Sequence, residues 1–185
     1  YSWKRLLAPE TAAQYAYFLF DIKNASEYNS GILKNSDQVG VRAVTESILE
    51  VTLKKPVVYF PSITTFMVTY PLRQDIIEKY GDQWTEPENT VTNGPYLLEE
   101  WQHEYKLVLN ANPKHYEGRP QINEVHIFVV QEPTTALTLY ETGEMDYIEL
   151  PPIAIPHYEK NAEYRNNPQL RGYYYGFNIQ KPPFD

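Results

Sequence analysis

The segment Thr92–Trp101 reads Thr-Asn-Gly-Pro-Tyr-Leu-Leu-Glu-Glu-Trp, and Tyr105–Tyr116 reads Tyr-Lys-Leu-Val-Leu-Asn-Ala-Asn-Pro-Lys-His-Tyr. Asn93-Gly94-Pro95 predicts a turn, because glycine reaches positive φ and proline fixes its own φ. Two runs of strand-forming residues follow, and Asn112-Pro113 ends the second. The stretch therefore predicts an antiparallel β-hairpin.

The alternation of side chains assigns the hairpin residues to faces, because successive residues of a strand point in opposite directions. In the first strand we expect Tyr96 and Leu98 on one face, and on the other Leu97, Glu99 and Trp101. In the second strand we expect one face with Lys106 and Val108, and the opposite face with Leu107 and Leu109.

These residues, NGPY, then Trp, a KLVL strand and NPxxY, resemble one large family. They are similar to the dipeptide- and oligopeptide-binding class of extracellular solute-binding proteins, the receptors of peptide ABC importers. The resemblance spans essentially the whole chain. It implies a mixed α+β chain that is a fragment of a type II periplasmic-binding-protein-like two-lobed fold, with part of an inserted smaller domain.

The resemblance also implies a domain organisation, since members of this family are much longer than 185 residues. We expect an internal fragment. Residues 1–72 would be part of the smaller inserted domain, and residues 73–170 part of the larger lobe that carries the hairpin. Residues 171–185 would form a strand that crosses toward the opposite lobe.

Secondary-structure signals outside the hairpin predict a mixed chain. Helices are expected at 9–21, 74–80 with Gly81 as a left-handed cap, 134–141, and around 157–161, and strands at 39–44, 47–53, 122–130, 145–150 and 172–178. Residues 56–66 fit a helix or a loop equally well.

Composition limits the function classes. Hydrophobic residues make up 42% of the chain and charged residues 22%, as in ordinary folded proteins. The net charge is −8, and no basic stripe is visible that would release counterions from nucleic acid, so we expect no nucleic-acid partner. No run of 18 apolar residues is present, so the sequence predicts no transmembrane helix.

The sequence also lacks the usual signs of catalysis and metal binding. It has no cysteine, no GxSxG, no P-loop and no GxGxxG, so we expect no enzyme and no catalytic residue. The four histidines are scattered without ligand spacing, which predicts no metal site and no cofactor. The carboxylates leave one distant alternative, an acidic carbohydrate-active enzyme.

The resemblance points to ligand-binding residues near the N-terminus. Tyr15 and Tyr17 lie in Thr11–Tyr17, which is similar to the T-A-S-P-Y-A segment whose tyrosine lines the peptide cleft in the family. The alternative interpretation is that Tyr15 is a half-buried helix residue.

A second candidate site follows from Arg171–Asn178, which resembles the YYYxxN strand between the two lobes. Alternation would place Tyr174, Gly176 and Asn178 together on one face, so all three are candidate ligand-binding residues. Some oligopeptide binders have an acidic residue where Gly176 stands, which implies a different pocket polarity here.

A third candidate is Glu149, which follows a turn at Gly143–Asp146 that is similar to a structural turn of the family. Glu149 would reach the cleft, whereas Gly143 and Asp146 are expected to cap a helix and form the turn.

Taken with the resemblance, these features predict a monomeric substrate-binding component that holds an extended oligopeptide between two lobes and delivers it to a membrane permease. It would be extracytoplasmic, either periplasmic or lipid-anchored on the outer face of the cell membrane. The nearest alternative is the same fold carrying nickel, haem or an oligosaccharide.

Overall fold

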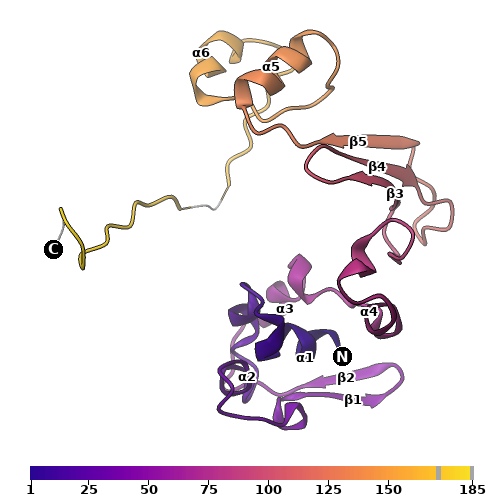
Figure 1. The fold of residues 1–185 in the computed structure, drawn as a ribbon, viewed down its shortest axis with the longest axis vertical. Coiled ribbons are helices and arrows are strands. Elements are labelled where there is room, and N and C mark those ends of the chain that lie inside the picture. Colours follow the sequence, from indigo (N-terminus) through magenta and orange to yellow (C-terminus); the bar gives the residue numbers. More distant parts are fainter. Residues whose placement is uncertain (170–171, 184–185) are drawn as a thin grey trace. The chain divides into compact units, whose positions relative to one another are not determined.

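The computed structural model describes residues 1–169 and 172–183, and the chain divides into two compact units, Tyr1–Phe128 and Val129–Asp185 (Figure 1). The predicted assignment of residues 1–72, 73–170 and 171–185 to parts of a two-lobed protein stays a prediction. Residues 170, 171, 184 and 185 lie outside the described residues.

The first unit contains short helices and two small sheets. Its α-helices are α1 Ser2–Leu7, α2 Ala25–Asn29, α3 Phe60–Ile63 and α4 Gln74–Tyr80. Its 3₁₀ helices are η1 Pro9–Thr11, η2 Ala16–Leu19, η3 Ser36–Gln38, η4 Met67–Thr69 and η5 Gly81–Thr85. Its strands are β1 Val41–Thr45, β2 Ile48–Val51, β3 Tyr96–Gln102, β4 Lys106–Ala111 and β5 Glu124–Phe128.

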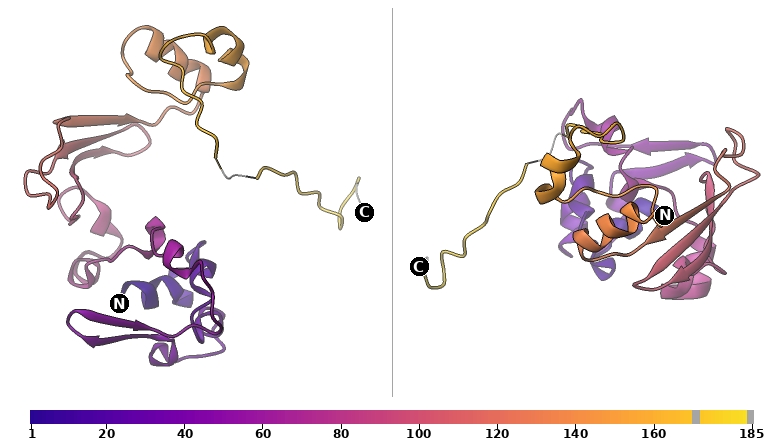
Figure 2. Two further views of the ribbon diagram at one scale, coloured as in Figure 1. Left: turned by 180° about the vertical axis from the view of Figure 1, so that it is seen from behind. Right: turned by 90° about the horizontal axis from the view of Figure 1, so that it is seen from above.

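A hydrophobic core joins α1, η2, α2 and α3 to the β1–β2 hairpin, in the part of the chain drawn in indigo and purple in Figure 2. Its fully buried large side chains are Leu7, Leu19 and Ile22. Trp3 closes the core from α1, because its indole Nε1 donates to the Thr69 carbonyl (2.7 Å) while its ring meets Phe60 edge-on. The burial of aliphatic and aromatic surface is the main force that holds these short helices together.

The predicted helix over 9–21 is wrong, because the chain forms η1 and η2 instead. Ala12 stands between them at φ 49°, a left-handed conformation that an α-helix cannot contain. Residues three apart lie on the same side of a 3₁₀ helix, so η2 buries Ala16 and Leu19 and leaves Tyr17 exposed.

Other predictions for this unit are confirmed. The expected pair of strands forms the antiparallel β1–β2 hairpin, with Val41 opposite Val51. The ambiguous segment 56–66 contains the single turn of α3. Helix α4 has the predicted bounds and ends at Gly81, but the predicted left-handed cap is wrong, because Gly81 combines a φ of 57° with a ψ of −132°.

The predicted hairpin is present as β3 and β4, and β5, which lies within the predicted strand 122–130, adds a third antiparallel strand. The predicted faces of β3 are wrong beyond Leu98. The register shifts between Leu98 and Glu100, so Glu99 is an extra residue and Trp101 pairs with Leu107. This β-bulge brings Trp101 to the face of Tyr96 and Leu98.

The bulge gives the sheet one apolar face. Since directly paired residues share a face, that face carries Tyr96, Leu98, Trp101, Leu107, Leu109, Ala111, Val125 and Ile127. The other face is mainly polar. There Gln102 donates to Glu100, the ammonium of Lys106 lies 3.6 Å from the Glu100 carboxylate, and these contacts lower the pKa of Glu100.

Asn112 ties the two ends of this hairpin together. Its side chain is nearly buried, with 7% exposure, and its Nδ2 donates to the Gly94 carbonyl (2.9 Å). Its Oδ1 accepts from the backbone N–H of Lys114 (2.9 Å), and its own N–H donates to the Pro95 carbonyl (2.8 Å). Asn112 therefore links the Asn93-Gly94-Pro95 turn before β3 to the Asn112-Pro113 turn after β4.

We expect Asn112→Leu to lower the free energy of unfolding by about 1–3 kcal/mol, because it leaves the Gly94 carbonyl and the Lys114 N–H without their partner. Urea unfolding followed by circular dichroism measures this. Asn123→Leu is a matched control, since the side chain of Asn123 accepts from the exposed Arg119, and its backbone carbonyl, which accepts from the Ala111 N–H, is retained. An equal loss in both variants would contradict the role assigned to Asn112.

The second unit contains α5 Pro133–Glu141, η6 Pro152–Ala154 and α6 Ile155–Tyr158. Helix α5 confirms the prediction, with Pro133 in its first turn and Gly143 at φ 79° after its end. The predicted strands at 145–150 and 172–178 are wrong: among the described residues, neither segment has a paired neighbour. A strand needs such a neighbour to satisfy its backbone hydrogen bonds.

Within the described parts of the chain, no helix is both long enough and apolar enough to cross a lipid bilayer.

Candidate ligand-binding site

The structure places Tyr15 and Tyr17 side by side on the surface of the first unit. Tyr15 precedes η2 and Tyr17 lies within it, and their ring centroids are 6.2 Å apart. Tyr15 is 43% exposed and Tyr17 is 54% exposed, although Ala16 between them is buried. The core thus fixes the backbone and leaves both rings facing outward.

Two phenylalanines that the sequence analysis did not identify complete this group. Phe18 stacks on Tyr17 with 4.6 Å between ring centroids, and Phe66 meets Tyr15 edge-on at 5.8 Å. Phe18 also lies against Phe66, at 4.8 Å. The position of Phe18 next to Tyr17 was a usable signal, but no pattern in the sequence brings Phe66 to them.

The three candidates Tyr174, Gly176 and Asn178 lie in an exposed, extended segment of the second unit. Tyr174 is 86% exposed, and a Cβ at Gly176 would meet no atom within 4 Å. Tyr173 and Tyr175 contact each other edge-on at 5.4 Å, as expected for alternating residues of an extended chain. Asn178 forms a turn, because its Oδ1 accepts from the N–H of Gln180 (3.0 Å).

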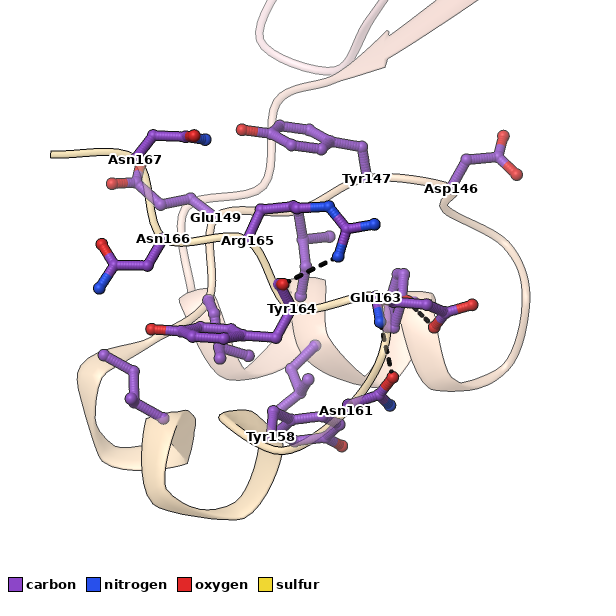
Figure 3. A pocket seen from close by; sticks show the side chains of 15 residues that line it. Asp146, Tyr147, Glu149, Tyr158, Asn161, Glu163, Tyr164, Arg165, Asn166 and Asn167 are labelled. Carbon is purple, nitrogen blue, oxygen red and sulfur yellow. Dashed lines mark hydrogen bonds between the residues drawn. The ribbon is translucent and has the colours of Figure 1, made fainter.

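Glu149 lines a cavity of about 410 Å³ within the second unit. The cavity has an apolar floor from α5 and α6 and a polar rim that includes tyrosines, asparagines and Arg165. In Figure 3, Glu149 lies on the same side as Asn166 and Asn167, whereas the side chain of Asp146 points away from them. The Arg165 guanidinium donates to the backbone carbonyls of Ala162 and Tyr164 (2.5 and 3.0 Å), which holds the rim.

One tyrosine hydroxyl joins α5 to the loop after α6, and a second joins α6 to α5. The Tyr140 hydroxyl donates to Glu163, and the Tyr158 hydroxyl donates to Glu141. In each case the hydrogen bond to the carboxylate is the main cause that raises the pKa of the tyrosine. Their stabilising contribution is full below the ordinary tyrosine pKa of about 10 and is lost as the pH rises through the raised value.

We expect Glu163→Gln to lower the pKa of Tyr140 toward its ordinary value, because a carboxylate that accepts the hydroxyl proton disfavours the phenolate. A ¹³C-NMR titration of the tyrosine ring carbons measures it. Glu141→Gln is the matched control. It should lower the pKa of Tyr158, whereas the pKa of Tyr140 should stay raised above its ordinary value. A Tyr140 pKa that Glu163→Gln leaves unchanged would contradict the assigned contact.

The candidates fall into two groups: Tyr15 and Tyr17 in the first unit, and Tyr174, Gly176, Asn178 and Glu149 in the second. Across residues 1–169 and 172–183, no three His, Asp or Glu side chains come together as metal ligands.

Exposed aromatic rings on a backbone fixed by the core, and a cavity with apolar and polar lining, are features typical of ligand-binding proteins. The whole chain, residues 1–185, matches the family described as bacterial extracellular solute-binding proteins, family 5, middle part. The chain belongs to this family, which confirms the predicted resemblance and the extracytoplasmic localisation.

Among curated relatives, the Salmonella typhimurium "Periplasmic oligopeptide-binding protein OppA" is 36% identical over 100% of this chain and 35% of its own. The Escherichia coli "Probable deoxycholate-binding periplasmic protein YgiS" is 34% identical over 99% of this chain and 35% of its own. The chain thus spans about 35% of the length of the relatives that it matches.

A solved structure of Haemophilus influenzae OppA in complex with RPPGFSPFR is 31% identical, with a TM-score of 0.77 over 86% of this chain and 32% of the other. The predicted fold class is therefore confirmed as part of a type II periplasmic-binding-protein fold with mixed helix and sheet.

Proposed function

We propose that this chain supplies part of the ligand-binding surface of a substrate-binding component that captures extended oligopeptides and delivers them to the permease of an ABC importer. The observation that carries the proposal is the exposed Tyr15–Tyr17 pair, whose rings lie 6.2 Å apart on a buried backbone. Family membership and relatives named for oligopeptides support it. We propose further that it works as a monomer.

Tyrosine suits the contact of a peptide whose sequence varies. Its ring offers flat apolar area to any side chain, and its hydroxyl can hydrogen-bond to a peptide backbone. We therefore assign ligand contacts to Tyr15, Tyr17 and Tyr174, all of which are exposed. Such contacts give affinity without demanding one particular peptide sequence.

The extended segment at 172–176 suits the backbone of a peptide. In the part of the chain that the structure describes, it has no paired strand, and Gly176 has open space around it. An extended peptide can hydrogen-bond to such a segment as an added strand. We assign Gly176 and Asn178 to this contact, and Glu149 to a separate pocket that takes a ligand side chain.

Closure of two lobes around the peptide would then provide the signal for the permease. In a hinge motion, a ligand that contacts both lobes stabilises the closed form over the open form.

Deoxycholate is the second candidate ligand, because YgiS, 34% identical to this chain, is named for it. A rigid steroid would use the aromatic rings but not the extended segment at 172–176, since it has no peptide backbone.

Isothermal titration calorimetry tests the proposal on the natural full-length chain that carries this sequence, after its ligands are removed by unfolding and refolding. The probes are tripeptides to pentapeptides, deoxycholate, nickel, haem and a maltooligosaccharide. We expect micromolar or tighter binding of peptides. Binding of any other probe without binding of peptides would overturn the proposal.

A further inference from the structure

Four aromatic side chains form a continuous surface in the first unit, which we call the aromatic wall: Tyr15, Tyr17, Phe18 and Phe66. Three of them come from η2 and the residue before it, whereas Phe66 comes from the chain after α3. Tyr15 contacts all three of the others, at centroid distances between 5.8 and 6.2 Å. Phe18 also contacts all three of the others, at centroid distances between 4.6 and 5.9 Å, so Tyr15 and Phe18 together form the centre of the wall.

The backbone at Phe66 is held in place by Thr69. The hydroxyl of this buried threonine donates to the carbonyl of Phe66 (2.8 Å), and the N–H of Thr69 donates to the same carbonyl (2.9 Å). The carbonyl of Thr69 in turn accepts from the Trp3 indole. The backbone of Phe66 is thus fixed to the core by Thr69, and the side chain of Phe66 is half-buried.

The contacts of Phe66 are directed at the exposed tyrosine. It meets Tyr15 with an interplanar angle of 87° and Phe18 with one of 43°. The edge-to-face pair with Tyr15 is one of the favoured geometries of aromatic rings. Phe66 therefore limits the orientations of Tyr15, which is itself 43% exposed.

We propose that Phe66 is a specificity-determining residue, and that the aromatic wall takes an aromatic side chain of the bound peptide in preference to an aliphatic one. A ligand ring that joins the wall gains further ring–ring contacts with Tyr15 and Phe66, which an aliphatic side chain of similar volume does not make. The inference rests on the proposed binding of peptides, and it adds the class of side chain that the site selects.

The test uses the natural full-length chain and two series of pentapeptides, each with four alanines and either one Phe or one Leu, placed in turn at each position. Calorimetry gives the Kd of every peptide for the wild type and for Phe66→Leu. At one position or more, we expect the wild type to prefer Phe over Leu about three- to tenfold, the range for one aromatic pair. Phe66→Leu should remove that preference.

Two further variants separate specificity from stability. Phe66→Trp should retain the preference, because it restores an aromatic partner for Tyr15. Phe128→Leu is the matched control: it also loses an edge-on aromatic contact, with Tyr105 at 6.2 Å, but on the three-stranded sheet. It should leave the preference unchanged.

The outcomes distinguish this inference from the function on which it rests. Equal loss of affinity for Phe and Leu peptides in Phe66→Leu would overturn the role of Phe66 alone. Loss of the preference for Phe in Phe128→Leu as well would also overturn it. No preference for Phe at any position of the wild type would overturn the wall as a selective site. No binding of any pentapeptide would overturn the proposed function together with the inference.

Discussion

Leu19→Ala is expected to lower the free energy of unfolding by about 2–5 kcal/mol, the cost of removing a buried leucine and leaving a cavity. Leu19 has 0% exposure, and it lies in η2 between the N-terminal helices and the β1–β2 hairpin. Because η2 is too short to be stable alone, its conformation depends on this contact with the core. The loss should appear as a lower midpoint of urea unfolding, followed by far-ultraviolet circular dichroism.

Leu49→Ala is the matched control for this prediction, since the same atoms are removed from a side chain that is 56% exposed. We expect it to change the free energy of unfolding by no more than about 0.5 kcal/mol. If both variants unfolded at the same urea concentration, Leu19 would not belong to the core that positions η2.

The second large effect concerns the ligand. Tyr15→Ala and Tyr17→Ala are each expected to weaken peptide binding by the natural full-length chain about tenfold, since tyrosine is enriched among the few binding-site residues whose truncation costs more than about 1 kcal/mol. Both rings are exposed while the backbone between them is buried, so the fold should tolerate the changes. Calorimetry with one tight-binding pentapeptide measures the loss.

Tyr105→Ala serves as the control for the tyrosines. Tyr105 is 56% exposed, but it lies at the turn of the β3–β4 hairpin, apart from the aromatic wall. The Kd of the Tyr105→Ala variant for the same pentapeptide should stay within about twofold of the wild-type value, because surface substitutions outside a site have small effects. Full affinity in both Tyr15→Ala and Tyr17→Ala would remove these residues from the binding site.

Local signals were sufficient to predict several elements. The Asn-Gly-Pro turn, the alternation of β4 and the proline that opens α5 all act within a few residues, and the corresponding elements are present. Gly81 ended α4 as expected for a residue that reaches positive φ. In these cases local propensity and the final packing favour the same conformation.

Predictions failed where the structure depends on distant residues. Ala16 and Leu19 are three apart, a spacing that suits both an α-helix and a 3₁₀ helix, so the sequence could not distinguish them at 9–21. The bulge at Glu99 depends on how β3 aligns with β4, which alternation within one strand does not specify. The segment 145–150 has β-forming residues but no paired strand in the described part of the chain.

In the candidate site, too, residues with a local sequence signal were identified, and a residue that depends on distant packing was missed. Tyr15 and Tyr17 were identified from a resemblance carried by neighbouring residues, and the structure shows both rings exposed and in contact. Phe66 was missed because it reaches Tyr15 only through the folding of α3 and η4 onto the core. The ligand contacts of all six candidates stay predictions.

Mass spectrometry of the molecules released by denaturation from the natural full-length chain, purified without added ligand, tests the central claim most directly. Peptide capture with loose sequence selectivity predicts a mixture of short peptides, enriched in aromatic residues if the aromatic wall is selective. A single non-peptide species, such as a bile acid or a metal with its chelator, would contradict peptide capture.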